Sequence, residues 1–434
     1  MLRLSDATET TAKVWVRRAE SGVMTVECNG QTFTGSTISP STEDGIGVCT
    51  VTGLAANTSY PFVVKVDGVQ VDSGTLKTMP QAGDTFSIGT GYCFDFRRPQ
   101  VAIEAMRELV DPALAVFLGD NLYLSGLAST ATDNGETFVQ IGNAGTFETE
   151  SQAMSAIYTH YRYAFKKPEV AALFRHCPTY AITDDHERPG DNWDYTIAQA
   201  NEHTTWATTQ QMVDDMGLWC RNAFHAYFKG MPENSHASRD TGWPVSKQLY
   251  YDKVVGDAHL IFLESIEYGQ ATGGAFTVRI GDTQLAWLQA VLLASTSTWK
   301  IVFCGGTDWS EFGSVDNAFN TWLVANGIKI VYVTGDLHAP CVCAPSNMLV
   351  VRSGPVGASV HANLPDGYGA SVVYKQLGNI SMGAANDEQR LAAGYITVNG
   401  TSHLDIGMID DAGNVFWRCR YTSDGVDNTQ MRFG

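Results

Sequence analysis

AVFLGDNLYL, residues 115–124, is the stretch around which the rest of the chain is organised. Its first four residues are largely apolar and predict a short buried strand, which ends at Gly119. Ligands of α/β sheets bind at the carboxyl ends of the strands, so Asp120 stands where a catalytic carboxylate would be. Taken alone, the stretch fits equally well with Asp120 as a helix cap and Tyr123 as a core residue. Three further strand ends with similar polar residues favour the functional interpretation.

Length and composition indicate an ordinary globular protein with two domains. The chain has 434 residues, of which 44% are hydrophobic and 17% are charged. No apolar run approaches the roughly 18 residues that a membrane-spanning helix needs. Residues 1–14 have neither the charged nor the apolar region of a signal peptide, which fits a cytosolic protein or a mature form with an added start methionine.

The formal net charge of -18 argues against nucleic-acid binding through a basic surface. An acidic protein also repels a phosphate group. Clustered carboxylates can overcome this repulsion by binding polyvalent cations, which then present positive charge to the substrate.

The nine cysteines are an odd number, so at least one of them is unpaired. Cys28 and Cys49 could pair across a small β-sandwich, and most of the others are expected to be buried thiols. Cys93 is the candidate for a special role, since it follows a predicted strand.

Residues 1–80 predict a small β-sandwich. Four stretches alternate apolar and polar residues with turns between them: 10–18, 23–30, 47–54 and 60–68. The segment 53–68 resembles the strand-and-corner signature of fibronectin type III and related Ig-like sandwiches. Residues 78–83 are short, polar and interrupted by Pro and Gly, which favours a linker between a domain at 1–80 and a second domain at 85–434.

From Thr85 onward, predicted strands alternate with helices, which is typical of an α/β fold. The expected strands are 86–93, 115–118, 179–187, 259–265, 299–306 and 328–338, and the expected helices are 98–109, 152–178 with a break near Pro168, 195–232 and 281–295. The last part, 394–421, predicts antiparallel hairpins with a turn at 410–414.

Four strand ends carry chemically active side chains: Cys93; Asp120 with Tyr123; Asp184, Asp185, His186 and Glu187; and Asp336 with His338. Parallel strands of one sheet bring their carboxyl ends together, so we expect these groups to share a crevice. Carboxylates, a thiolate and a phenolate repel one another unless cations bind between them. Thiolate and phenolate together favour ferric iron, and the additional carboxylates offer sites for calcium, magnesium or manganese. Asp308, at another strand end, fits a ligand or a loop cap.

In the order and spacing of its motifs the chain resembles the PhoD-type alkaline phosphatase/phosphodiesterases, a branch of the calcineurin-like metallophosphoesterases. The motifs are GYC (91–93), FLGDNLY (117–123), YRYAFKKPEVAALF (161–174), DDHE (184–187), GDTQLAWL (281–288), STSTWKIV (295–302) and TGDLH (334–338). Each motif is weak alone, but the ordered set is specific. The resemblance implies a calcineurin-like β-sandwich flanked by helices, preceded by a small β domain.

The resemblance also implies a set of metal ligands. Cys93, Asp120 and Tyr123 would bind Fe3+, with Asp120 shared between metals. Asp185, or its neighbour Asp184, would bind a second cation. Asp336 and His338 lie where the last strand contributes ligands. The accompanying metal of this family is typically Ca2+, with Mn2+, Zn2+ and Mg2+ as alternatives.

The implied activity is metal-dependent hydrolysis of phosphate monoesters or diesters. A metal-bound hydroxide would attack, and His186, held protonated by Glu187 or an Asp neighbour, would protonate the leaving oxygen. Asp185 is grouped with His186 in the catalytic motif, and Arg188 and Asn121 are candidate substrate contacts. The family is commonly exported, which favours a periplasmic or secreted protein.

One departure keeps an alternative open. The family usually has an Asp-Thr-Arg type motif after its central hydrophobic strand, but this chain has LESIEY at 263–268, with no Arg. A non-catalytic binding or structural protein with the same fold therefore stays the second hypothesis. The sequence specifies neither the physiological ester nor the oligomeric state.

Overall fold

The N-terminal strands form two antiparallel sheets. A computed structural model describes residues 1–41, 43–96, 99–124, 131–133, 136–138, 150–188, 209–232, 249–265, 270–272, 275–278, 280–306, 318–336, 338, 340–344, 347–356, 372–375 and 391–433. One sheet contains β1 (Leu2–Ala7), β2 (Ala12–Arg17) and β5 (Ile46–Val51), and the other, in the order β4-β3-β6-β7, contains β3 (Gly22–Cys28), β4 (Gln31–Ile38), β6 (Ser59–Val66) and β7 (Val69–Lys77). The prediction of an all-β N-terminal part is confirmed, while its fibronectin-like identity and the boundary near residue 80 stay predictions.

Cys28 and Cys49, which the sequence left as a candidate pair, are both free buried thiols. Cys28 ends β3 of the four-stranded sheet, whereas Cys49 lies within β5 of the three-stranded sheet. The Sγ of Cys49 instead donates to the carbonyl of Phe33 at 3.4 Å.

The first large sheet has seven strands in the order β12-β9-β8-β22-β23-β24-β25. Its parallel part is β8 (Thr85–Gly91), β9 (Leu114–Leu118) and β12 (Thr179–Ile182). The antiparallel part, predicted as hairpins, is β22 (Ala392–Asn399), β23 (His403–Asp410), β24 (Val415–Thr422) and β25 (Gly425–Phe433). β22 pairs directly with β8, so the last strands of the chain extend the sheet that begins at Thr85.

The second large sheet has the order β13-β14-β17-β18-β20-β19-β21. The four parallel strands at its centre are β14 (Ala258–Phe262), β17 (Trp299–Cys304), β18 (Ile330–Thr334) and β20 (Met348–Arg352). Its antiparallel edges are β13 (Tyr251–Val255) on one side and β19 (Cys341–Cys343) with β21 (Val372–Lys375) on the other. Short apolar runs that are covered on both faces explain why these strands lack polar alternation.

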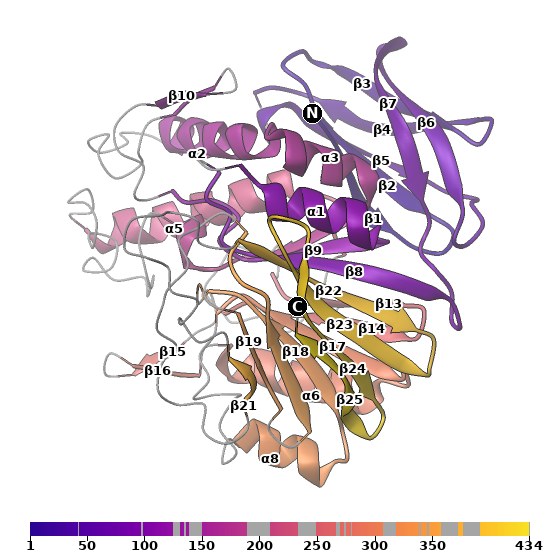
Figure 1. Ribbon diagram of the computed structural model, residues 1–434. Coiled ribbons are helices and arrows are strands. Elements are labelled where there is room, and N and C mark those ends of the chain that lie inside the picture. The colour runs from indigo at the N-terminus through magenta and orange to yellow at the C-terminus, as the bar shows by residue number, and fades with distance from the viewer. Residues whose placement is uncertain are drawn as a thin grey trace.

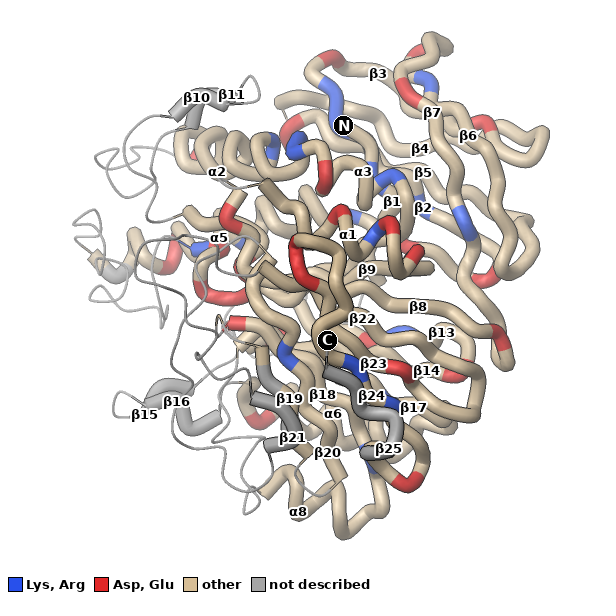
Figure 2. Tube along the Cα trace, in the orientation of Figure 1, with Lys and Arg blue, Asp and Glu red and all other residues tan. Residues whose placement is uncertain are grey.

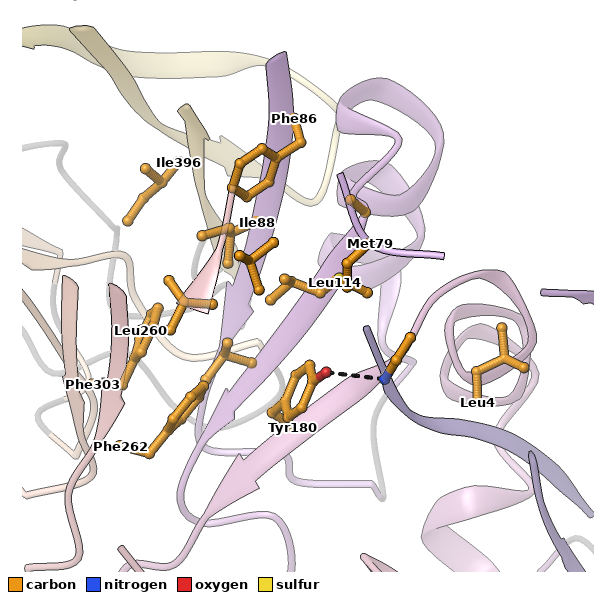
Figure 3. Close-up of a cluster of buried hydrophobic side chains, with 14 of the residues drawn as sticks. Leu4, Met79, Phe86, Ile88, Leu114, Tyr180, Leu260, Phe262, Phe303 and Ile396 are labelled. Atoms are coloured by element: carbon orange, nitrogen blue, oxygen red, sulfur yellow. Dashed lines mark hydrogen bonds between the residues drawn. The ribbon is translucent and has the colours of Figure 1, made fainter. Parts of the chain in front are cut away.

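The two large sheets face one another across a continuous apolar core. Figure 3 shows Ile88 and Leu114 of the first sheet opposite Leu260, Phe262 and Phe303 of the second. All five side chains are completely or almost completely buried. This packing is the sandwich that the sequence predicts, and it places the carboxyl ends of the parallel strands of both sheets at a common edge.

Helices cover the outer faces of the sandwich, as Figure 1 shows. The first sheet is covered by α1 (Val101–Val110), α2 (Glu150–Phe165), α3 (Pro168–His176) and α5 (Gln210–Tyr227), and the second by α6 (Gly281–Ala294) and α8 (Ala318–Ala325). The predicted break at Pro168 is confirmed, since α2 ends at Phe165 and Pro168 begins α3. Two short hairpins, β10 (Ala131–Asp133) with β11 (Glu136–Phe138) and β15 (Gln270–Thr272) with β16 (Ala275–Val278), complete the strands.

None of the helices among the described residues combines the length and the apolar character that a bilayer crossing requires. Figure 2 shows Asp and Glu distributed along both the N-terminal sheets and the large sandwich.

Candidate metal centre

Four loops at one edge of the sandwich bring the predicted ligands together. Cys93 follows β8, Asp120 follows β9, and Asp185 and His186 follow β12, all in the first sheet, whereas Asp336 follows β18 of the second sheet. The expectation that one parallel sheet supplies all of them is therefore wrong. A crevice forms all the same, because facing sheets with parallel strands also present their carboxyl ends side by side.

Two glycines permit the close approach of these strand ends. A Cβ at Gly119, whose φ is +90°, would lie 2.5 Å from the Cβ of Asp184. A Cβ at Gly335 would lie 2.7 Å from the carbonyl oxygen of Leu118. Each glycine directly precedes a candidate ligand. In the Gly-Asp pairs at 119–120 and 335–336, the glycine leaves room for the neighbouring loop and the aspartate supplies a carboxylate to the site.

Three of the candidate ligands have a left-handed backbone. The φ angles are 54° at Cys93, 50° at Asp120 and 61° at Asp336. This conformation is uncommon outside glycine and persists where the surrounding structure enforces it, which happens preferentially at functional sites. Backbone bonds from Phe94 N to Asp120 O (2.9 Å) and from Cys93 N to the carbonyl of Gly119 (3.3 Å) hold two of the loops against each other.

Cys93, Asp120 and His338 form the first group of candidate ligands, with one donor atom from each lying within 4.8 Å of the others. The Sγ of Cys93 donates to Oδ2 of Asp120 at 3.1 Å. The hydroxyl of Tyr123 also donates to Oδ2 of Asp120 at 3.3 Å and lies 3.3 Å from Nε2 of His338. A thiol, a carboxylate, a phenol and an imidazole thus meet at one point, and this donor set fits a Lewis-acidic transition metal.

The second group consists of Asp120, Asp185 and His186, whose donor atoms again lie within 4.8 Å of one another. Asp120 belongs to both groups, as expected for a carboxylate shared between two cations. Its Oδ1 accepts a hydrogen bond from the backbone N–H of His186 at 3.2 Å, and the His186 ring lies 4.3 Å from the ring of Tyr123.

The electrostatics of the site match a cation-binding role. Burial, together with the charges of Asp185 and Asp184, raises the pKa of Asp120 well above its usual value. Burial and Asp120 likewise raise the pKa of Cys93, and burial and Cys93 raise the pKa of Tyr123. Such groups ionise together only if a positive charge lies among them, which a bound metal ion supplies.

Glu187 braces the loop that carries His186, a role that the sequence analysis missed. Its two carboxylate oxygens accept backbone N–H groups, Oε2 from Asp184 at 2.6 Å and Oε1 from Asn121. With Asp184 it forms a capping box on the short helix η2 (Asp185–Glu187). Burial raises the pKa of Glu187 to about 7. The D-x-x-E spacing at 184–187 is the sequence signal for this capping box, and the expectation that Glu187 or an Asp neighbour holds the His186 ring stays a prediction.

The other predicted site residues lie close by. Asp336 is outside both ligand groups found among the described residues, but its charge raises the pKa of Cys93 and Asp120. Asn121 is buried and donates from Nδ2 to Ile182 O at 2.7 Å, and buried Arg188 donates from Nη1 to Asp184 O at 3.1 Å. Substrate contact by Asn121 or Arg188 stays a prediction.

Two further positions bear on the sequence predictions. Glu264, which replaces the expected Asp, is fully buried and accepts the hydroxyl of Thr183 at 2.8 Å, so it ties the two sheets together behind the site. Asp308 and the residues directly after Ser265 lie outside the described residues.

Comparisons with known proteins agree with this geometry. Residues 93–304 match the family model described as PhoD-like phosphatase, and residues 1–83 match a domain of unknown function, DUF7800. The chain is similar in structure to PhoD, with a TM-score of 0.71 at 16% identity over 100% of this chain and 91% of that chain. It is also similar to the purple acid phosphatase PPD1 from yellow lupin (Lupinus luteus) seeds, with a TM-score of 0.60 at 12% identity over 96% and 72% of the two chains. A search of curated proteins gave no match.

Proposed function

We propose that this chain, whose residues 93–304 match the PhoD-like phosphatase family model, is a phosphoesterase that hydrolyses phosphate monoesters, diesters or both with His186 as general acid. The observation that carries the proposal is the position of Asp120 between two ligand groups, one with Cys93 and His338 and the other with Asp185 and His186. A carboxylate shared in this way is the central ligand of a two-metal site for phosphoryl transfer.

The donor types differ between the two groups, and they suggest different metals. Cys93, Tyr123 and His338 with Asp120 provide sulfur, phenol and imidazole donors, which suit Fe3+. Asp185 with Asp120, and Asp336 beside them, provide the carboxylate oxygens that suit Ca2+, with Mn2+, Zn2+ or Mg2+ as alternatives. When bound, these cations would neutralise the phosphoryl oxygens and activate a water molecule as nucleophile.

The side chains of this protein contribute orientation and a proton. His186 lies on η2 with its backbone anchored to Asp120, and its ring packs beside Tyr123. An imidazole so placed can donate a proton to the leaving oxygen of a phosphate group held by the cations. Glu187 fixes η2 relative to the loop after β9, and this brace keeps the position of His186 constant during the reaction.

The experiment that tests this proposal combines metal analysis, visible absorption and hydrolysis of a chromogenic phosphate ester. We expect the protein to contain Fe3+ and, in addition, one divalent metal. It should show a visible tyrosinate-to-iron band, and hydrolysis should stop when a chelator removes the metals. A colourless protein that hydrolyses the ester with calcium, zinc or manganese alone would contradict the iron assignment and leave the activity. A metal-bound protein that hydrolyses neither monoesters nor diesters would contradict the proposal.

A further inference from the structure

Helix α5 connects the N-terminal sheets to the loop that carries His186. The helix contacts η1 (Glu43–Gly45), which lies between β4 and β5 of the N-terminal part, and it also contacts η2 with His186. It packs against α2 along its length, and Figure 1 shows the two helices in one layer beside the first large sheet. One rigid helix therefore touches both parts of the molecule.

The carboxyl end of α5 and the turn after it are held by side chains of the N-terminal sheets. Trp15 Nε1 donates to Ala226 O in the last turn of α5 (3.1 Å). In the turn after the helix, Arg3 Nη2 (3.0 Å) and Ser5 Oγ (2.7 Å) donate to Lys229 O, and Lys13 Nζ donates to Gly230 O (3.1 Å). The last carbonyls of a helix lack partners within the helix and carry partial negative charge. Cationic and polar donors from another part of the chain therefore fix the end of α5 firmly.

Asp44 of η1 forms hydrogen bonds with residues of β2, α2 and α5. Its Oδ1 accepts hydrogen bonds from Arg17 Nη2 at 3.0 Å and from Arg162 Nη1 of α2 at 2.8 Å. Its Oδ2 accepts the hydroxyl of Tyr227 of α5 at 2.5 Å. The Asp44 side chain is only 11% exposed. One half-buried carboxylate with three partners thus links the N-terminal sheets to both α2 and α5.

A chain of buried aromatic rings continues from Asp44 toward the site. The ring of Tyr227 stacks on that of Tyr161 of α2, with centroids 4.6 Å apart and planes at 18°. Tyr161 is buried within the electrostatic reach of Glu187 and Arg188: burial and the charge of Glu187 raise its pKa, while Arg188 lowers it. Helix α5, which carries Tyr227, in turn contacts η2.

We propose that Asp44 is a positioning residue for His186, acting through Tyr227 and the contact of helix α5 with η2. The N-terminal sheets then belong to the catalytic apparatus, because they set the location of α5 and, through it, the location of η2. The inference rests on the proposed function, in which His186 protonates the leaving group. Displacements of about 1 Å at a reacting group can lower turnover by about a hundredfold.

The decisive variant is Asp44→Asn, which keeps the shape of the side chain and removes its charge. We expect kcat for a chromogenic phosphate ester to fall about tenfold, while KM changes less than twofold and the metal content is unchanged. Tyr227→Phe removes only the hydroxyl and keeps the ring stack, so we expect a smaller fall of kcat in the same direction. This milder variant decides the question if Asp44→Asn does not fold.

Asp72→Asn is the matched control. Asp72 of β7 accepts two hydrogen bonds from Arg175 of α3, at 2.7 and 2.9 Å, so it also joins the N-terminal sheets to the helical layer. This pair involves neither α5 nor η2. We expect Asp72→Asn to leave kcat unchanged, and an equal fall of kcat in both variants would overturn the inference.

Hydrogen exchange of the peptide that covers η2 provides a readout independent of turnover. Faster exchange in Asp44→Asn than in wild type and in Asp72→Asn would support the coupling. Unchanged exchange in Asp44→Asn would overturn the inference whatever the activity is. A wild-type protein that hydrolyses no ester would instead overturn the proposed function, and exchange alone would then decide whether Asp44 positions the loop.

Discussion

In β9, Val116 and Leu118 lie in the core between the two large sheets, whereas Asp120, two residues further along, lies in the candidate metal centre. The core residues are extended, apolar and completely buried. Asp120 is also buried, but it has a left-handed backbone and several carboxylate neighbours. A conformation of this kind costs about 1–3 kcal/mol at each residue. The comparison teaches that the core provides the stability that holds the site in a geometry it would not adopt alone.

Asp120→Asn should separate the two regions most clearly. The variant removes the carboxylate shared by both ligand groups, so we expect metal binding to be lost and hydrolysis to fall by more than about a hundredfold, the upper range for loss of an outer-sphere partner. The metal-free variant should melt no lower than metal-free wild type, because the neutral amide relieves repulsion with Asp185 and Asp184. Metal analysis, ester hydrolysis and thermal melting check these points. A fully active variant would refute the assignment.

Phe262→Ala should give the opposite pattern. Phe262 is completely buried and stacks on Tyr251 at 4.4 Å and on Phe303 at 5.1 Å between ring centroids. We expect the free energy of unfolding to fall by about 3–5 kcal/mol, with kcat per folded molecule unchanged. Urea unfolding and active-site titration against metal content measure the two quantities. If kcat falls as much as it does in Asp120→Asn, the claim that the core contributes to stability and not to catalysis is wrong.

Tyr123→Phe should have a moderate effect confined to the site. The variant removes one hydroxyl, which contacts Asp120 and His338, and keeps the ring beside His186. We expect loss of the visible tyrosinate-to-iron band and a fall in hydrolysis of about 10- to 100-fold, with little change in melting temperature. An unchanged spectrum in an iron-loaded variant would exclude Tyr123 as a ligand.

Asp72→Asn should have the smallest effect, because the pair lies at the surface. The side chains of Asp72 and Arg175 are 21% and 42% exposed, so the loss at pH 7 should be below about 1 kcal/mol. Burial opposes ionisation, but the bonds from Arg175 outweigh it and lower the pKa of Asp72. A carboxyl with a lowered folded-state pKa stabilises the protein above its unfolded-state pKa, and this contribution is lost as the pH falls through the folded-state value.

Urea unfolding of wild type and Asp72→Asn as a function of pH measures this contribution. The difference between them should be constant near neutral pH, begin to shrink near pH 4 and disappear once the pH is below the lowered folded-state pKa of Asp72. A difference that grows on acidification would contradict the sign of the pKa shift.

The sequence allowed the strands, the break at Pro168 and the ends of β8, β9, β12 and β18 to be predicted, because each depends on a local pattern. Apolar runs closed by Gly mark strand ends without reference to the rest of the fold. By contrast, the division of these strands between two facing sheets depends on pairings such as that of β8 with β22, which no local pattern specifies.

The supporting contacts of the site were less accessible to sequence analysis than its ligands. The ligands belong to motifs, whereas the bonds from Arg162 and Tyr227 to Asp44 join residues that are far apart in the chain. The capping box of Asp184 and Glu187 could be predicted only in part. Its local spacing is visible in the sequence. The bond from the backbone of Asn121 to Glu187 is not, because it joins residues that are far apart in the chain.

The pairing of β8 with β22 has a consequence for co-translational folding. Thr90, three residues before Cys93, pairs with Gly394, so the strand that leads to this candidate ligand gains its second neighbour only after the chain has been translated past residue 394. Translation of the intervening chain takes on the order of tens of seconds. Until then, β8 can pair only with β9, so the first large sheet cannot be complete around the loop of Cys93 before β22 has been made.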